Sequence, residues 1–471
     1  MKITLINPPI TVEQIYGKYS GLASFQPPIG LCSLAGYLIK NGHEVNITDA
    51  NVLNLSTPDI LKTIATAAPH LIGIYMNTSN YYAASRLVSS IKNAGKPRRI
   101  VCGGPHPTFL PEDTLRETAA DYCVIGEGEE TLSELATALE NNAADLSSIR
   151  GLAFKTDDKG ITINEPRERI TDLDKLPFPA VHLLPDLSRY KLYLLQYKRL
   201  PYMTVMTSRG CPHRCVFCNT PFGKIVRFHS PEYVADYIGH LSKQSGIREI
   251  FFVDDTFTID EERVLRICDL IRKRGLDVTW NACVRANIKN KDIFHKMKEA
   301  GCWTCALGVE SGDAGILRLI KKDISLDDVR SSCDTILKAD LVLKTFFILG
   351  NPGETLETIE KTIRFARSLR SHYPVFSLMT PFPGAELWKT AEEYGKFDRT
   401  DFRKLLLAGS DPVFIPYGLT KEILLEKQRE AFRRLYLAPD MILRQLALIR
   451  SPEDVRKIAR AFLAFIRIQL N

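Results

Sequence analysis

The chain has 471 residues, of which 45% are hydrophobic and 25% are charged. This is the composition of a folded globular protein and excludes a disordered one. The length exceeds what one ordinary hydrophobic core organises, so we expect two or three domains. The net charge of +7 is too modest to indicate a nucleic-acid partner without a focused basic patch.

Other features of the sequence bear on where the protein works. The sequence contains no run of about 20 apolar residues, so we expect no transmembrane helix. The first residues enter a strand without the pattern of a signal peptide. The 11 cysteines are odd in number, and several lie in apolar strands or helices, which argues against a disulfide framework. We therefore expect a cytoplasmic protein with reduced thiols.

Apolar strands alternate with helical segments over residues 1–150. This alternation predicts a parallel sheet covered on both faces, as in a doubly wound, flavodoxin-like α/β domain. The predicted strands are 2–6, 44–48, 71–76, 99–103 and 122–125.

Polar or glycine-rich breaks follow consecutive strands of this domain. They are Asn77–Asn80, Gly103–His106 and Gly126–Glu129. Ligands of doubly wound sheets bind beyond the carboxyl ends of the strands, and glycine lets a ligand approach the backbone closely. Each break alone is also compatible with an ordinary turn, but together they predict a binding edge.

The next segment reads as a connector. A turn at Asp157–Gly160 between two short apolar runs predicts a β-hairpin, and the prolines at 177, 179 and 185 predict an extended linker. We place a hairpin and proline-rich linker at 151–195, a second α/β domain at 196–392 and a helical C-terminal region at 393–471.

A compact cysteine run lies just inside the second domain. Cys211, Cys215 and Cys218 form a C-x3-C-x2-C pattern directly after an apolar strand. Three thiolates so close together suit a loop around one metal centre. Thiolates are the usual ligands of iron–sulfur clusters, and three of them leave one iron of a 4Fe–4S cluster open. The alternative is a structural zinc site completed by His213 or a distant cysteine.

Six strand–helix units follow in this domain and predict an incomplete barrel with a helical tail. The predicted strands are 202–206, 249–253, 278–283, 305–309, 344–349 and 375–379. Catalytic groups of such barrels stand at the carboxyl ends of the strands. Asp254, Arg285 and Glu310 lie there and can hold the hydroxyl, carboxylate and ammonium groups of a zwitterionic nucleoside. Asp254 and Glu310 can alternatively be helix caps or ion-pair members.

The cysteine run and the strand-end motifs together resemble the radical S-adenosylmethionine superfamily. The carrying segments are SRGCPHRCVFCNT, LGVESGD, FFILGNPGET and TPFPGAEL. The resemblance implies a partial (β/α)6 TIM-like barrel with a 4Fe–4S cluster on the cysteine triad. It also implies S-adenosylmethionine on the open iron, with Phe217 against its adenine and Asp254, Arg285 and Glu310 among its contacts.

The first domain resembles the cobalamin-binding domain that precedes some radical S-adenosylmethionine cores. The segments CGGPHPTFLPE and GEGEET carry this resemblance. The D-x-H-x-x-G motif whose histidine ligates cobalt in other cobalamin domains is missing, so we interpret His106 as a loop or nucleotide-tail contact. The domain can also be a relic that has lost cobalamin. The resemblance implies cobalamin contacts at Thr78, Ser79, Gly103, Gly104, Pro105, His106, Gly126, Glu127 and Gly128.

The combined resemblance implies a cobalamin-dependent radical S-adenosylmethionine methyltransferase. We expect it to methylate an unactivated carbon through a 5′-deoxyadenosyl radical and methylcobalamin. One alternative is a radical cyclase or rearrangement enzyme acting on a tetrapyrrole or polycyclic lipid without methyl transfer. Another is a cobalamin- or metal-binding sensor that never cleaves S-adenosylmethionine.

The expected partners are a small-molecule or lipid-like substrate and an electron donor such as flavodoxin or ferredoxin, with no nucleic acid. Arginines recur among apolar residues towards the C-terminus. This pattern is typical of a helix docked on the barrel or of peripheral contact with the inner face of the membrane. Cys302 and Cys305 form a second close pair, for which we expect buried apolar roles. A redox pair or a second cluster is the alternative.

Overall fold

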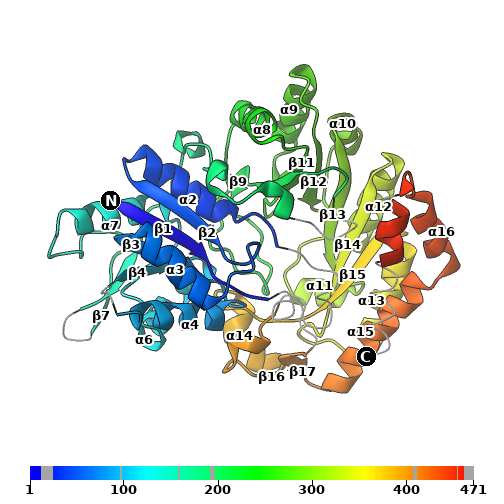
Figure 1. Cartoon of the computed structure of the whole chain (residues 1–471). Helices are drawn as coiled ribbons and strands as arrows, with labels where there is room; N and C mark the ends of the chain where they lie inside the picture. The colour runs from blue at the N-terminus through cyan, green and yellow to red at the C-terminus, as the bar shows by residue number, and fades with distance from the viewer. Residues whose placement is uncertain are drawn as a thin grey trace.

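The structure is a computed structural model that describes residues 1–11, 25–95, 98–156, 160–190, 197–406, 411–452 and 454–460. Two α/β units lie side by side, with the first in blue and cyan and the second in green to orange (Figure 1). Among the described residues, no helix combines the length and apolarity needed to cross a membrane. The end of the basic C-terminal stretch, 461–471, lies outside the described residues.

The first unit is built on a seven-stranded sheet of order β2-β1-β3-β4-β5-β6-β7. Its first five strands are parallel and follow the 2-1-3-4-5 order of flavodoxin-like folds. They are β1 (Lys2–Asn7), β2 (Glu44–Asp49), β3 (Leu71–Tyr75), β4 (Arg99–Gly103) and β5 (Tyr122–Val124).

Helices cover both faces of this sheet, as its almost continuously apolar strands require. Apolar residues of α2 (Ile29–Lys40) and α7 (Glu129–Glu140) form a core on one face. Those of α3 (Thr57–Ala67) and α4 (Tyr81–Lys92) form a core on the other. The sequence therefore predicted the doubly wound architecture correctly, although it did not indicate α3.

The hairpin predicted in the linker forms as β6 (Leu152–Lys155) and β7 (Ile161–Ile163). It does not stand apart from the first unit, because β6 pairs antiparallel with β5 and extends the sheet. The remainder of the linker carries short 3₁₀ turns at Leu173–Lys175, Val181–Leu183 and Leu187–Arg189.

The second unit is a six-stranded parallel sheet of order β15-β14-β13-β12-β11-β8. No strand pairing joins its edges β8 and β15 among the described residues, so the barrel is incomplete, as predicted. The strands are β8 (Tyr202–Val205), β11 (Glu249–Phe252), β12 (Thr279–Val284), β13 (Cys302–Glu310), β14 (Val342–Leu349) and β15 (Tyr373–Leu378).

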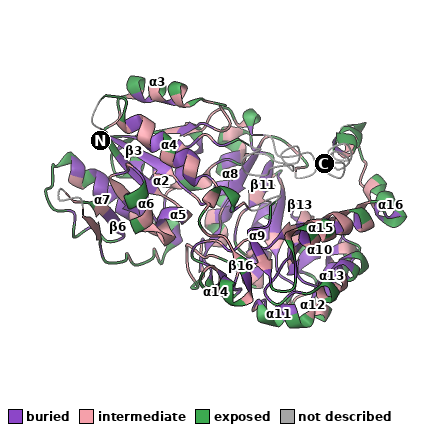
Figure 2. Cartoon of the chain, turned by 90° about the horizontal axis from the view of Figure 1, so that it is seen from below, coloured by how far each residue is buried: buried purple, intermediate pink, exposed green. Residues whose placement is uncertain are grey.

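One large hydrophobic core lies between this sheet and its outer helices, which Figure 2 shows as purple strands beneath helices with green outer faces. The covering helices are α8 (Pro231–Ser245), α9 (Glu261–Lys273), α10 (Ile293–Glu299), α12 (Leu326–Lys338), α13 (Leu356–Ser368) and α15 (Lys421–Tyr436). Helix α11 (Ala314–Leu319) belongs to a smaller core that also contains Val216 and Met379.

The C-terminal region departs from the purely helical expectation in one place. After α14 (Glu386–Tyr394), β16 (Gly395–Phe397) pairs antiparallel with β17 (Phe414–Pro416). Beyond it, α15 docks on the barrel, where Gln428 donates a hydrogen bond to the carbonyl of Phe376 on β15 at 2.9 Å. The last described helix is α16 (Pro439–Ala447).

Candidate active site at the barrel rim

The cysteine run lies in a loop whose base is closed by backbone pairing. Strand β9 (Ser208–Arg209) pairs with β10 (Arg227–Phe228), and the amide of Cys211 donates to the carbonyl of Gly223 at 3.0 Å. Gly210 enters the loop with φ +97°, and a Cβ there would collide with the carbonyl of Ile225. The tight entry therefore requires glycine immediately before the first cysteine.

The thiols of this loop differ in their surroundings. Cys215 is buried, Cys211 is half-buried and Cys218 is exposed. A hydrogen bond from the Cys218 thiol lowers the pKa of Cys215, and the nearby cations Lys322 and Arg285 act in the same direction. A lowered pKa favours the thiolate, which is the form that ligates metal.

The chemistry of the donors bears on the choice between zinc and a cluster. A structural zinc site is normally closed by four protein ligands, whereas three thiolates hold a 4Fe–4S cluster with one iron left open. Cys211, Cys215 and Cys218 lie in one short loop, and the thiols of Cys215 and Cys218 are close enough to share a hydrogen bond. A donor set of three thiolates from one loop fits a 4Fe–4S cluster with an open iron.

Asp254 stands at the carboxyl end of β11 and is tied to the segment before the cysteines. Its Oδ1 accepts hydrogen bonds from the backbone amide and the hydroxyl of Thr207, at 2.9 and 3.0 Å, and from the hydroxyl of Ser208 at 2.5 Å. Its Oδ2 is buried without a hydrogen-bond partner. This unpaired oxygen is available to a polar ligand. Burial raises the pKa of the carboxyl group.

Arg285 and His213 present further unsatisfied groups at the same rim. Arg285 donates through Nη2 to the carbonyl of Lys322, while its Nε is buried and has no partner. The Nε2 of His213 in the cysteine loop is equally buried and unpaired. So is the Nδ2 of Asn281, but Asn281 lies in the first half of β12, opposite Thr304, and not at the rim. Buried polar groups are normally hydrogen-bonded, so orphans gathered at one edge indicate a site for a polar ligand.

Glu310 has an unusual backbone at the end of β13. Its φ is +68°, a strained conformation for a residue with a side chain. A register shift between Gly308 and Glu310 accompanies it. Its carboxylate forms an ion pair with Lys322 at 2.6 Å, and each side chain is only 9% exposed. Burial opposes the charge on Lys322, but Glu310 and Cys215 raise its pKa overall.

Lys322 is a rim residue that sequence reasoning missed. It comes from the turn after α11, and only the fold brings it to Glu310 and the cysteine loop. Phe217 is half-buried and packs against the cluster that contains Val216 and Met379. The rim thus combines the cysteine triad, two cations, two carboxylates and an aromatic ring, a donor set that fits a zwitterionic nucleoside bound at a cluster. Individual contacts of Phe217, Asp254, Arg285 and Glu310 with S-adenosylmethionine remain predictions.

Cys302 and Cys305 lie at the opposite end of the barrel strands. Both are on the first half of β13, are almost inaccessible and belong to the main core. Burial raises the pKa of Cys302 well above its usual range. The protonated thiol of Cys302 and the burial of both side chains suit the apolar roles expected for this pair.

The predicted cobalamin edge of the first unit is arranged around His106. The sequence suggested a loop from Gly103 to His106, but a short helix, α5 (Pro105–Phe109), begins within it. Proline at the first helical position makes that start favourable. The His106 ring is 1% exposed, lies against Tyr81 and Phe402 at centroid distances of 4.5 and 4.9 Å, and shares a 3.2 Å hydrogen bond with Thr78.

Two observations bear on whether this edge can hold cobalamin. Gly126 has φ +79° and open space where a Cβ would stand, so its backbone can be approached closely. The Nε2 of His106 is buried without a partner. These features, which follow β5 and β4, fit a ligand beyond the carboxyl ends of the strands. Gly104, by contrast, is required by packing, because a Cβ there would collide with the carbonyl of Met76.

Glu127 lies between the two units and not at a free loop tip. Its carboxylate pairs with Arg209 at 3.0 Å and Arg227 at 2.8 Å, while Arg209 also pairs with Glu129 at 2.6 Å. All four side chains are 5–7% exposed. Burial opposes ionisation of Glu127, but the two arginines hold its pKa below the usual range. We call these four residues the interdomain ion-pair cluster.

Further contacts bring the two rims together. The ring of Phe109 on α5 lies where a Cβ on Gly384 would stand, in the loop after β15. The hydroxyl of Ser79 donates to the carbonyl of Leu405 at 3.2 Å. The carboxyl edges of both sheets therefore meet at one interface. The roles of Thr78, Ser79, Gly103, Gly104, Pro105, His106, Gly126, Glu127 and Gly128 in binding cobalamin stay predictions.

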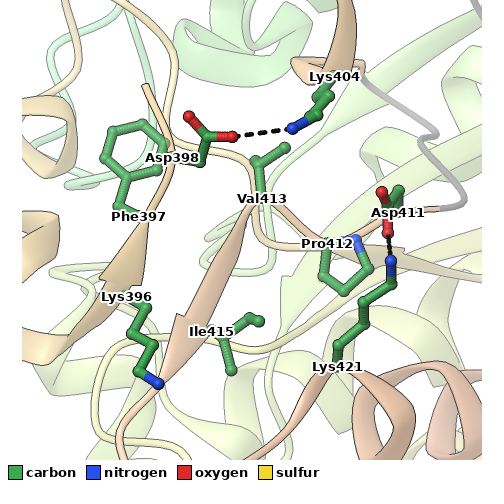
Figure 3. Close-up of a pocket in the computed structure, with 9 residues that line it drawn as sticks. All are labelled: Lys396, Phe397, Asp398, Lys404, Asp411, Pro412, Val413, Ile415 and Lys421. Carbon is green, nitrogen blue, oxygen red and sulfur yellow. Dashed lines mark hydrogen bonds and ion pairs between the residues drawn. The ribbon is translucent and has the colours of Figure 1, made fainter. Parts of the chain in front are cut away.

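A surface pocket of about 300 Å³ lies beside the β16–β17 pair (Figure 3). Asp398 pairs with Lys404 there at 2.9 Å and Asp411 pairs with Lys421, while Lys396 extends away from both pairs. The pocket is lined by Lys396, Phe397, Asp398, Lys404, Asp411, Pro412, Val413, Ile415 and Lys421. None of these residues belongs to the predicted cofactor sites.

Comparisons with known proteins agree with this arrangement. A B12 binding domain matches residues 22–136, and the Radical SAM superfamily matches residues 205–366. The chain is 37% identical over 449 residues to an uncharacterized methyltransferase of Pyrococcus horikoshii, covering 95% of each chain. It is 27% identical to the anaerobic magnesium-protoporphyrin IX monomethyl ester cyclase of Rubrivivax gelatinosus, covering 88% of this chain and 75% of the relative.

Solved structures share the fold at low sequence identity. The cobalamin-dependent S-adenosylmethionine radical enzyme OxsB, with aqua-cobalamin and S-adenosylmethionine bound, matches with TM-score 0.75 and 17% identity over 100% of this chain and 72% of its own. The radical S-adenosylmethionine methyltransferase TsrM of Kitasatospora setae matches with TM-score 0.72 and 16% identity, and the match covers 100% of this chain and 99% of its own. The chain therefore belongs to the cobalamin-binding radical S-adenosylmethionine superfamily, and it is a cobalamin-dependent radical enzyme that uses a 4Fe–4S cluster, S-adenosylmethionine and cobalamin.

Proposed function

We propose that this enzyme transfers a methyl group to an unactivated carbon of its substrate. The relative that is 37% identical over almost the whole chain bears the name of a methyltransferase. Two more distant relatives also bear methyl-transfer names, the bacteriochlorophyllide d C-12(1)-methyltransferase of Chlorobaculum tepidum at 24% identity and the hopanoid C-3 methylase of Methylococcus capsulatus at 26%.

The observation that carries the proposal is the contact between the two rims. The interdomain ion-pair cluster joins Arg209 and Arg227, which flank the cysteine loop, to Glu127 and Glu129 at the cobalamin edge. Charge-assisted hydrogen bonds in a buried setting fix geometry firmly. A methyl donor at one edge and a radical generator at the other must act on the same carbon, so a fixed rim-to-rim distance supports such a transfer.

When bound, the cluster and S-adenosylmethionine supply a one-electron route to a hydrogen-abstracting radical, and cobalamin supplies a methyl group. The chain itself contributes binding and positioning. Lys322 and Arg285 present cations to a carboxylate, and Asp254 and Glu310 present acceptors to hydroxyl or ammonium groups. The buried ion pairs and Phe109 close the interface against water, which protects reactive intermediates from side reactions.

The test is anaerobic reconstitution with iron, sulfide and cobalamin, followed by assay with S-adenosylmethionine deuterated in its methyl group. We expect 5′-deoxyadenosine together with a product that has gained the labelled methyl group, on at least one member of a broad substrate panel. Formation of 5′-deoxyadenosine with products that never carry the label would contradict methyl transfer.

A second candidate is a radical ring closure without methyl transfer. It is favoured by the 27% identity to the magnesium-protoporphyrin ester cyclase over 88% of this chain. Product mass separates the two functions, because methylation adds one methylene unit whereas ring closure by oxidation removes hydrogen. The same labelled assay therefore decides between them.

A further inference from the structure

The concave side of the barrel sheet carries a lysine, Lys344 on β14, that does not pair with any residue of the cofactor rim. Along β14, Leu343, Phe347 and Leu349 belong to the core under the outer helices. Side chains of a strand alternate between faces, so Val342, Lys344, Phe346 and Ile348 face the lumen of the barrel. Their intermediate burial, against the full burial of the alternate positions, agrees with that orientation.

Strand register places a thiol at the level of this lysine. Lys344 on β14 pairs with Ala306 on β13, and Ala306 pairs with Cys283 on β12. Ala306 is small, so the lysine stem can extend across it. Lys344 and Cys283 are close enough to interact electrostatically: burial raises the pKa of Cys283 and lowers that of Lys344, and each partner partly offsets the shift of the other.

Lys344, which is only partly buried, differs from the buried cations of the described residues. Arg209, Arg227 and Lys322 each pair with a buried carboxylate, and Arg263 donates to two backbone carbonyls. No carboxylate of the described residues lies within ion-pair distance of Lys344, and its ammonium contacts the ring of Phe346 at 4.9 Å from the centroid. A partly buried ammonium without a counter-ion is costly, so its retention points to a partner that the chain does not supply.

The position of Lys344 relates it to the cofactor rim. Phe346, Gly308 and Arg285 lie two residues closer to the carboxyl ends of their strands than Lys344, Ala306 and Cys283 do. The Glu310–Lys322 pair lies over Gly308. One side-chain layer along a strand is about 6.6 Å. Lys344 thus lies one layer below the rim, between the half-buried apolar side chains of Phe346 and Val342.

We propose that the barrel lumen receives part of the substrate and that Lys344 binds an anionic group on it, a carboxylate or phosphate carried by an apolar body. The ammonium forms the ion pair, and the apolar lumen residues pack against the body of the molecule. This inference deepens the proposed function by naming the chemical class of its substrate. Lys344 is thereby a substrate-binding residue and takes no part in cofactor binding.

The test uses the anaerobically reconstituted holoenzyme with S-adenosylhomocysteine present, so that Lys322 and Arg285 are occupied. Hexanoate, hexyl phosphate and hexanol are titrated by calorimetry into the wild type, Lys344→Met and Lys344→Arg. Lys396→Met is the matched control, because Lys396 is exposed at the surface pocket beside β16. Loss of a hydrogen bond to a charged group should weaken binding of the favoured anion about 10- to 100-fold in Lys344→Met.

We expect hexanoate or hexyl phosphate to bind the wild type and Lys396→Met more tightly than hexanol does, with partial retention in Lys344→Arg. The tighter of the two anions identifies the head group. Equal binding of all three probes, or equal anion binding by Lys344→Met and the wild type, would overturn the inference. Methionine removes an unpaired, partly buried charge at similar volume, so the variant should fold, and melting of each variant checks this. If anion binding depends on Lys344 but no labelled product forms, the proposed methyl transfer is refuted and the role of Lys344 in substrate binding stands.

Discussion

The carboxyl edges of the two parallel sheets are built in different ways. At the edge of the first unit, the chain's own side chains meet each other: His106 with Thr78, and Glu127 with two arginines. At the edge of the second, buried atoms of Asp254 and Arg285 lack partners, as the Nε2 of His106 does at the first. The first edge therefore serves to hold the units together around a ligand, and the second presents polar groups directly to one.

The largest expected effect comes from the cysteine loop. Cys215→Ser should abolish cluster assembly and 5′-deoxyadenosine formation, because serine does not replace a thiolate ligand of iron. Iron and sulfide analysis with the visible spectrum measures assembly. The matched control is Cys305→Ala, at the far end of β13 in the main core. It should retain iron, and loss of iron in the control would assign the second cysteine pair to the metal site.

Next in size is the interdomain ion-pair cluster. Glu127→Ala leaves Arg209 and Arg227 with one carboxylate, which should destabilise the protein by about 3–5 kcal/mol. Glu232→Ala removes an ion pair with Arg266 in which both side chains are about half exposed, and it should cost less than about 1 kcal/mol. Urea unfolding of both variants measures the difference. Equal midpoints would show that the buried cluster does not join the units.

A smaller, pH-dependent effect is expected at Glu354. Its carboxyl group is 1% exposed and accepts hydrogen bonds from the amides of Gly350 and Asn351, yet burial raises its pKa to about 7. The folded state then holds this proton where the unfolded state has released it. Stability should fall as pH rises from about 4.5 to about 7, by up to about 3 kcal/mol in total.

Glu354→Gln removes the titrating group and should flatten this part of the profile. Urea midpoints of the wild type and the variant at several pH values test the difference. Parallel profiles would mean that the backbone amides hold Glu354 ionised across the whole range.

The smallest effect concerns His106. Its buried ring is enclosed by Tyr81 and Phe402, and burial lowers its pKa to about 4. His106→Phe should leave the absorbance of bound cobalamin unchanged, because the enclosed imidazole serves packing and not cobalt ligation. A shift of the corrin bands in the variant would instead make His106 a cobalt ligand.

Local patterns predicted the framework of both units well. Apolar runs predicted β4 to the residue and the other strands of both sheets to within a few positions, because a strand buried on both faces must be apolar throughout. The cysteine spacing and the strand-end positions of Asp254, Arg285 and Glu310 are likewise local signals. The periodicity of apolar residues, however, did not predict α5 or the β16–β17 pair.

What the sequence could not predict depends on contacts between distant residues. Lys322 reaches Glu310 only through the turn after α11, and Arg227 meets Glu127 across 100 positions of the chain. Lys344 reads as one more charged residue in a strand until register places it beside Ala306 and Cys283. The spacing of residues in the sequence does not predict pairs that form between distant parts of the chain.

The central claim is that the cysteine triad holds a 4Fe–4S cluster with one iron left for S-adenosylmethionine. Mössbauer spectroscopy of protein reconstituted with ⁵⁷Fe, before and after addition of S-adenosylmethionine, tests it most directly. The account predicts about four irons per chain and a changed signal from one of them when S-adenosylmethionine binds. A protein that takes up zinc in place of iron, or a cluster whose irons do not respond to S-adenosylmethionine, would contradict it.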